Sequence, residues 1–333
     1  MSDWELVKAR TAEVGAVWRS ADGLLYKRTG GGASAEAREL QALAGLGYPV
    51  PEVVEIGQDE NGQDYFIERS VGEMSLHDRA LADAARSSPV GPDLVDAAAT
   101  ISRQLLTAQV RSSLPRGSEA SNAWFDRAGF TSNVFAENPD LDTRGVRQAV
   151  QHAIDRLAGI AMCRSHLDYG LPNAFDRGVI DWQHHGLAPL GYDVYPMLEI
   201  VPFKGGNRGY EFTAAQRERY LAALDRTAAD LLGRTLREFL GEFLLVKCFF
   251  FLALMRPTDR TRTDKYIKWQ YRRALFAQCL EQYESAGAIH PDTFPTLAEF
   301  AGQLAGNGAT SSRSRLPPGS SWRDLQGDRR RTS

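Results

Sequence analysis

The chain has 333 residues, of which 43% are hydrophobic and 24% are charged, and its formal net charge at pH 7 is -3. This composition is typical of a globular protein, and the length suffices for two packed lobes or domains. The near-neutral charge lacks the strongly basic character of a dedicated nucleic-acid-binding protein. We therefore expect no nucleic-acid partner.

The cysteines and the apolar segments bear on the compartment. The three cysteines form no C-x-x-C pair, and their odd number fits a reducing compartment better than a disulfide framework. The N-terminus lacks the basic and apolar regions of an export signal. The most apolar run, 239–255, contains Glu242 and Lys247 and is short for a membrane span of about 20 residues. These features predict a cytoplasmic protein without a membrane partner, and a buried helix over that run.

The N-terminal part, residues 1–69, has the pattern of a small sheet with one helix. Asp22-Gly23 lies between two apolar stretches and predicts a hairpin turn. Leucines at helical spacing then predict a helix with Ser34 as its N-cap, stopped by 49–51. Two further strands are expected around the turn at Asn61-Gly62.

From residue 70 the pattern changes to long amphipathic helices, which predict a mainly helical region over 70–310. The expected helices cover 94–110, 146–161, 214–232, 235–255 and 264–283. A short hairpin at 174–182 interrupts them. The tail, 311–333, is rich in Ser, Arg, Gly and Pro with little to bury, so we predict that it is disordered.

The segment that carries chemistry runs from His166 to Asn173, H-L-D-Y-G-L-P-N, and Asp181 follows it in the run I-D-W. Phosphoryl transfer needs a carboxylate that orients the attacking hydroxyl and oxygen ligands that fix metal ions. Asp168 can accept the substrate proton, and the oxygens of Asn173 and Asp181 are donors of the kind that Mg2+ prefers. We expect Asp168 to be the catalytic base and Asn173 and Asp181 to be the metal ligands.

These motifs resemble the aminoglycoside phosphotransferase family, whose catalytic loop reads H-G-D-x-x-x-x-N and whose metal-binding aspartate lies in an I-D-W or I-D-x context. The resemblance extends to residues 15–27 and 36–51, and it is weak in the helices of the substrate site. It implies an α+β, two-lobed protein-kinase-like fold, with a small antiparallel-sheet N-lobe over 1–69 and a larger, mainly helical C-lobe. Leu167 departs from the family pattern, which has glycine there.

The resemblance also implies an ion pair that fixes the phosphates. Lys27 looks like the family's strand lysine, which contacts the α- and β-phosphates, although an exposed strand lysine is the alternative. Its partner in the following helix would be Glu36, with Glu39 as the second candidate. We expect Lys27 and Glu36 to lie within ion-pair distance.

Other site residues are expected around the nucleotide and the catalytic loop. Gly15 would let the backbone approach the phosphates, and the backbone from Glu68 to Ser70 would meet the nucleotide base. We expect His166 to brace the catalytic loop. Asp193 would support that loop from beneath, with a helix cap as its alternative role.

The hairpin after the catalytic loop is shorter than is typical of the family. Asp176-Arg177-Gly178 can close such a tight turn, and we expect Gly178 to adopt a positive φ there.

The function that follows is transfer of the γ-phosphate of ATP or GTP, with Mg2+, to a hydroxyl of a small molecule. Residues 199–300 hold 15 basic and 13 acidic side chains, and this lack of an acidic surplus favours a neutral or anionic antibiotic or sugar over a polycation. The alternatives are a metabolic kinase of a sugar or amino alcohol and a non-catalytic nucleotide-binding module. The sequence leaves the oligomeric state open.

Overall fold

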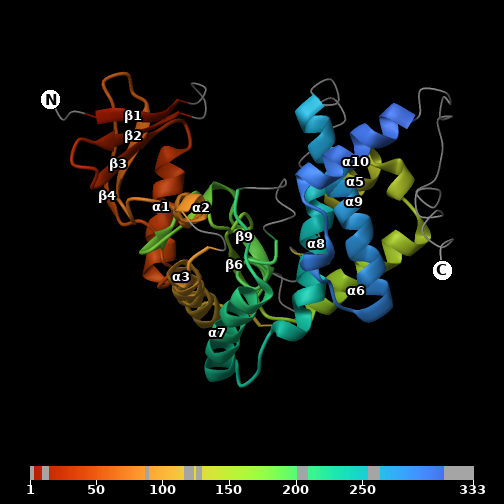
Figure 1. Ribbon diagram of the computed structural model, residues 1–333. Helices are drawn as coiled ribbons and strands as arrows, with labels where there is room; N and C mark the ends of the chain where they lie inside the picture. Colours follow the sequence, from red (N-terminus) through yellow and green to blue (C-terminus); the bar gives the residue numbers. More distant parts are fainter. Residues whose placement is uncertain are drawn as a thin grey trace.

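The computed structural model describes residues 4–9, 15–86, 90–115, 124, 130–200, 209–253 and 263–310. A small sheet with one helix lies at one side of the molecule, and the longer helices lie beneath it and at the other side (Figure 1). This is the α+β, two-lobed kinase-like fold that the sequence predicts. The expected disordered tail lies outside the described residues.

The N-lobe is built on a five-stranded antiparallel sheet with the strand order β1-β2-β3-β5-β4. Gly23 and Gly62 close two of its hairpins with φ of 72° and 73°, a region that favours glycine, so both predicted turns are confirmed. The strands are β1 Trp4–Ala9, β2 Ala16–Ser20, β3 Leu25–Thr29, β4 Val53–Gln58 and β5 Asp64–Arg69.

Helix α1, Ala33–Gly45, packs on this sheet through buried Ala37, Leu40 and Leu43. Its N-cap is Gly32, so the prediction of Ser34 as the cap is wrong by two residues. The glycine run itself makes the entry turn, with the Ala33 N–H donating to the Gly30 carbonyl at 3.0 Å, and the helix therefore begins before the serine.

The C-lobe contains the helices that the hydrophobic periodicity predicts, together with shorter ones that it does not. The predicted buried helix is α8, and within the described residues no helix has the length and apolar character needed to cross a bilayer. The helices are α2 Leu76–Arg86, α3 Pro92–Arg111, α5 Phe130–Glu137, α6 Arg144–Ala158, α7 Ala214–Leu232, α8 Leu240–Ala253, α9 Thr263–Ala286 and α10 Leu297–Thr310.

Short strands hold the segment between α6 and α7. Strand β6, Met162–Ser165, pairs with β9, Gly186–Pro189, and the hairpin of β7, Ala174–Phe175, and β8, Gly178–Val179, lies between them in sequence. This hairpin confirms the prediction, but Gly178 does not adopt the predicted positive φ. A side chain at Gly178 would instead lie 2.6 Å from Val71 Cγ1, so the glycine is needed for close contact with the segment that joins the lobes.

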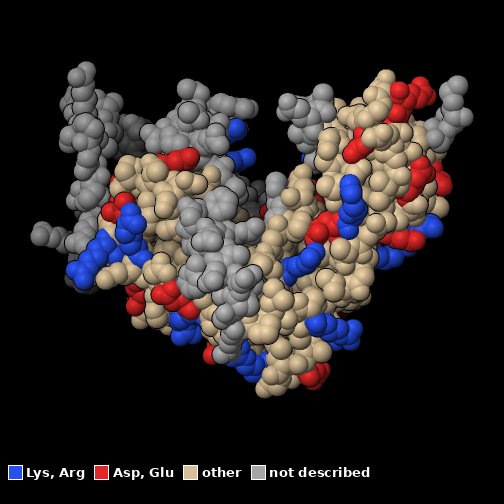
Figure 2. Space-filling view, turned by 180° about the vertical axis from the view of Figure 1, so that it is seen from behind, with Lys and Arg blue, Asp and Glu red and all other residues tan. Residues whose placement is uncertain are grey.

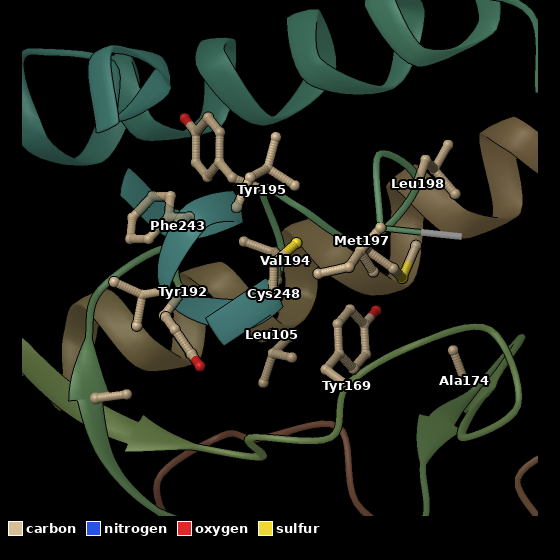
Figure 3. Packing of buried hydrophobic residues seen from close by; sticks show 14 of the residues in the cluster. Leu105, Tyr169, Ala174, Tyr192, Val194, Tyr195, Met197, Leu198, Phe243 and Cys248 are labelled. Atoms are coloured by element: carbon tan, nitrogen blue, oxygen red, sulfur yellow. The ribbon is translucent and has the colours of Figure 1, made fainter. Parts of the chain in front are cut away.

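The core of the C-lobe lies directly beneath the catalytic loop. Figure 3 shows Tyr169 of that loop beside Leu105 of α3 and Met197, whereas Tyr192 and Tyr195 of the same cluster lie near Phe243. The Tyr169 hydroxyl is 2.9 Å from Ser102 Oγ, which also accepts a hydrogen bond from the Tyr220 hydroxyl at 2.8 Å. Burial and this polar network fix the loop on α3 and α7, which lie side by side in Figure 1.

Candidate active site

A cavity of about 290 Å³ lies between the lobes, on the side where β1, β2 and β3 face the hairpin of β7 and β8. Its upper wall includes Val17 and Arg28, and its lower wall includes Asn173 and Asp181. Residues 68–72, which lead out of β5 toward α2, form one end. A cleft with apolar walls and a few convergent polar groups is the usual form of a small-molecule site.

The catalytic loop, residues 166–173, is held by one buried carboxylate. Asp193 accepts hydrogen bonds from the backbone N–H groups of His166 at 2.8 Å and Leu167 at 3.0 Å, and from Gln109 Nε2 at 2.9 Å. The supporting role predicted for Asp193 is therefore confirmed. Because two successive amides share one carboxylate, the loop is fixed at the residues just before Asp168.

His166 braces the loop from inside the protein, as predicted. Its Nε2 donates to the Ile180 carbonyl at 2.8 Å, which ties the loop to the residue before Asp181. Burial lowers the pKa of His166, although the charge of Asp193 acts in the opposite direction. The neutral ring is consistent with a structural hydrogen bond to a carbonyl.

Leu167 occupies the position where the family pattern has glycine, and its φ is 68°. This left-handed conformation is unfavourable for a side chain with a Cβ atom, so the backbone keeps a conformation for which leucine is poorly suited. Asp168 follows directly and is exposed. Its carboxylate is thus accessible to a substrate hydroxyl.

Asn173 and Asp181 have the features expected of metal ligands. The Asn173 amide nitrogen donates to the Asp168 backbone carbonyl at 3.0 Å, which leaves the amide oxygen as the group open to a metal ion. Asp181 Oδ1 is buried and has no hydrogen-bond partner, in a residue whose φ is 69°. An orphaned carboxylate oxygen and an amide oxygen, from two residues that line the same cavity, fit Mg2+.

The described side chains alone do not offer a complete metal shell. Within the described part of the chain, no group of three or more His, Cys, Asp or Glu side chains is arranged to hold a metal ion. A site with few protein ligands is the pattern expected when phosphate oxygens and water supply the rest of the Mg2+ shell.

The predicted ion pair between Lys27 and Glu36 is wrong by one residue. The pair is formed by Arg28, whose Nη1 lies 3.6 Å from Glu36 Oε1, while Lys27 Nζ lies 4.0 Å above the Tyr65 ring. Adjacent residues of a strand point to opposite faces, so the side chain that lines the cavity is Arg28, and Lys27 lies on the other face of β3.

Arg28 is enclosed by acidic groups. Its Nε donates to Glu68 Oε1 at 2.8 Å, and its side chain is 12% exposed. Burial alone lowers the pKa of Arg28, but the carboxylates of Glu68 and Glu36 outweigh that effect and raise it above its ordinary value. Glu36 is therefore in the expected register, whereas Glu39 pairs with Arg164 of β6.

Gly15 and Ser70 have structural neighbours that the sequence did not indicate. Gly15 has a φ of 83°, and a Cβ there would lie 1.4 Å from the Thr29 carbonyl oxygen, so close backbone packing against β3 requires glycine. The Ser70 N–H donates to the Leu24 carbonyl at 2.8 Å, and the Ser70 carbonyl accepts from Arg177 Nη2 at 3.2 Å.

Comparison with known proteins adds to this geometry. The model of the phosphotransferase enzyme family (APH) matches residues 27–239. No curated protein matches the chain. A protein from Ralstonia eutropha JMP134, provisionally named an aminoglycoside phosphotransferase, is similar in structure, with a TM-score of 0.53 and 16% identity over 86% of this chain and 94% of its own.

Two further structures have nucleotides in their names. The GDP complex of wild-type aminoglycoside 2'-phosphotransferase-IIIa has a TM-score of 0.51 and 15% identity, over 85% of this chain and 93% of its own. A thermostable mutant of aminoglycoside phosphotransferase APH(4)-Ia, in a ternary complex with ADP and hygromycin B, has a TM-score of 0.51 and 16% identity, over 86% and 95%. At these identities the likeness shows the fold. Because the family model spans most of the chain, this protein belongs to the phosphotransferase enzyme family and is a small-molecule kinase.

Proposed function

We propose that this protein transfers the γ-phosphate of ATP or GTP to a hydroxyl group of a small molecule, with Asp168 as the catalytic base. The observation that carries this proposal is the arrangement around the catalytic loop. Asn173 bonds to the Asp168 backbone, and Asn173 lines the same cavity as Asp181 and Arg28. Phosphoryl transfer requires these groups together: a base, oxygen ligands and a cation for the phosphates.

The reaction assigns one task to each group. The substrate hydroxyl gives its proton to the Asp168 carboxylate while its oxygen bonds to the γ-phosphorus. The bond from that phosphorus to the bridging oxygen breaks, and the nucleoside diphosphate leaves. Mg2+, held by Asn173 and Asp181, would neutralise charge on the phosphates. Arg28, positioned by Glu36 and Glu68, would bind phosphate oxygens.

The acceptor that we favour is a hydroxylated antibiotic that is neutral or anionic, so that the reaction serves resistance or self-protection. The charges of the C-lobe support this choice, because buried Glu199 and Glu242 are paired with Arg217 and Arg156 and present no free negative charge. A metabolic kinase of a sugar or amino alcohol is the second candidate. We place the reaction in the cytoplasm, where nucleoside triphosphates are found.

Replacement of the base separates catalysis from binding. In Asp168→Asn, phosphoryl transfer should fall by about 10²- to 10⁴-fold while the dissociation constant of the nucleotide stays close to that of the wild type. Asp181→Ala is the companion variant, and it should weaken the Mg2+-dependent part of nucleotide binding. The measurements are transfer to a panel of hydroxylated compounds and titration of nucleotide with and without Mg2+. Wild-type turnover in Asp168→Asn would show that Asp168 is not the base, and a tight nucleotide complex that transfers phosphate to no compound would favour a binding module.

A further inference from the structure

Glu68 has a buried carboxylate that the transfer reaction does not account for. The residue is 3% exposed and lines the cavity between the lobes. Its Oε1 accepts the hydrogen bond from Arg28 Nε at 2.8 Å, whereas its Oε2 is buried and has no hydrogen-bond partner. A buried carboxylate oxygen without a donor is costly, and in a ligand cavity it indicates a donor on the ligand.

The walls around Glu68 fit a flat ring. On the N-lobe side the cavity is lined by Val17 of β2, and on the C-lobe side by Phe175 and Ile180, which follow the catalytic loop. Apolar side chains contributed by both lobes suit an aromatic base that stacks between them. Asn173 and Asp181 lie on the same lower wall, so the phosphates would extend toward them.

The backbone that leads out of β5 is largely occupied by the protein itself. The Arg69 N–H donates to the Glu52 carbonyl at 2.9 Å, and the Ser70 N–H donates to the Leu24 carbonyl at 2.8 Å. The Ser70 carbonyl accepts from Arg177. The side chain of Glu68 therefore offers an acceptor at the edge of the cavity where these backbone groups are already used.

We propose that Glu68 Oε2 accepts a hydrogen bond from the exocyclic amino group of adenine and thereby selects ATP over GTP. This inference rests on the proposed function. Adenine carries an amino group at position 6, a hydrogen-bond donor, whereas guanine carries a carbonyl oxygen there, an acceptor. Opposite a carboxylate oxygen, guanine would leave two acceptors facing each other without a proton between them.

The single open oxygen argues against recognition of guanine through its N1–H and N2 amino groups. Two neighbouring donors are best met by both oxygens of a carboxylate, but Glu68 Oε1 is already bonded to Arg28. A site that must leave a buried polar group unpaired rejects the wrong ligand strongly. We expect a preference for ATP over GTP of about tenfold to a hundredfold in affinity, the factor for one charged hydrogen bond.

Equilibrium binding of Mg-ATP, Mg-GTP and Mg-ITP to the full-length wild-type chain tests the proposal without any substitution. Inosine triphosphate has the carbonyl of guanine at position 6 but lacks its N2 amino group. We expect ITP to bind as weakly as GTP. Binding of ITP or GTP as tight as that of ATP would overturn the role of the amino group.

Substitution of Glu68 supplies the second arm. In Glu68→Gln the amide can turn to donate or to accept, so the ratio of ATP to GTP affinity should fall toward one. Glu36→Gln is the matched control, because it removes the other carboxylate from Arg28 yet should weaken both nucleotides to a similar degree. An unchanged ratio in Glu68→Gln would contradict the proposal. If no triphosphate binds to the wild type, both this inference and the proposed function fail. Equal binding of ATP and GTP with intact phosphoryl transfer would reject this inference alone.

Discussion

At the residue scale, Arg28 is a largely buried cation that lines the cavity between the lobes, and its carboxylate neighbours hold it in place. Arg28→Met should weaken nucleotide binding by about tenfold or more, because a charge-assisted contact to phosphate is lost. Lys27→Met is the control on the opposite face of β3 and should leave binding essentially unchanged. Titration with a nucleotide analogue measures both. A larger loss of nucleotide affinity in Lys27→Met than in Arg28→Met would show that Lys27, as the sequence predicts, is the cation that contacts the phosphates.

Leu167 keeps a left-handed backbone at the residue before Asp168. This conformation costs a residue with a Cβ about 1–2 kcal/mol, and glycine escapes that cost. Because the Leu167 side chain also packs against the core, the informative comparison is between the two variants that both lack it. Leu167→Gly should exceed Leu167→Ala in unfolding free energy by about 1 kcal/mol. Urea denaturation measures this difference. A higher unfolding free energy for Leu167→Ala than for Leu167→Gly, the order that is usual inside helices and strands, would exclude backbone strain.

The sequence predicted which residue types form this site better than it predicted their orientation. Asp168, Asn173, Asp181 and Glu36 stand in recognisable motifs, so their positions in the fold could be anticipated. Lys27 and Arg28 are adjacent cations, and the choice between them depends on how β3 pairs with β5, a contact between distant parts of the chain. The side chain of Glu68 lines the cavity because of the same pairing, which no local pattern shows.

At the element scale, the catalytic loop depends on the turns that follow β9. Asp193 belongs to that segment and is 1% exposed, and it satisfies two successive amides of the loop, one buried and one partly buried. Asp193→Ala leaves them without an acceptor, which should cost about 1–3 kcal/mol of folding free energy for each. We expect kcat to fall more than nucleotide affinity, because the loop carries Asp168, the proposed base. Asp193→Asn retains one acceptor oxygen, so its stability and its kcat should lie between those of the wild type and those of Asp193→Ala. Denaturation and steady-state kinetics measure these quantities. If kcat were unchanged in a folded Asp193→Ala protein, the loop would not need this anchor.

The elements predicted most accurately are those with long periodic patterns. Helix α7 begins and ends at the predicted residues, and its capping box at Thr213 and Gln216 explains why its start is so well defined. The strands β6 and β9 were not predicted, because four residues give too short a pattern and their pairing joins residues about two dozen positions apart. Helix α1 began earlier than expected because glycines served as its entry turn.

At the scale of the whole molecule, the two lobes are joined by more than the segment that leads out of β5. Tyr48 follows α1, and its hydroxyl donates to the Arg164 carbonyl of β6 at 3.0 Å. Glu39 of α1 pairs with the Arg164 side chain. The Ser70 carbonyl accepts from Arg177 of the C-lobe hairpin. These contacts set the position of the N-lobe relative to the catalytic loop, so Asp168 and the cavity between the lobes are positioned before any ligand binds.

The distribution of charge over the whole molecule leads to the last prediction, which concerns the acceptor. Acidic and basic side chains are mixed over the face shown in Figure 2. Ion pairs such as Glu199 with Arg217 and Glu242 with Arg156 cancel the negative charge that a polycation would need. We therefore expect macrolide-like, nucleoside or sugar hydroxyls to be phosphorylated in preference to kanamycin-like polycations.

Coupled measurement of nucleoside diphosphate release over a matched panel of these acceptors tests this expectation, and identification of the phosphorylated product confirms the acceptor. Because a polycation attracted by surface charge alone would lose affinity as ionic strength rises, the panel is run at low and high salt. Efficient phosphorylation of the polycations alone, at both salt concentrations, would reject the charge argument and leave the kinase assignment intact.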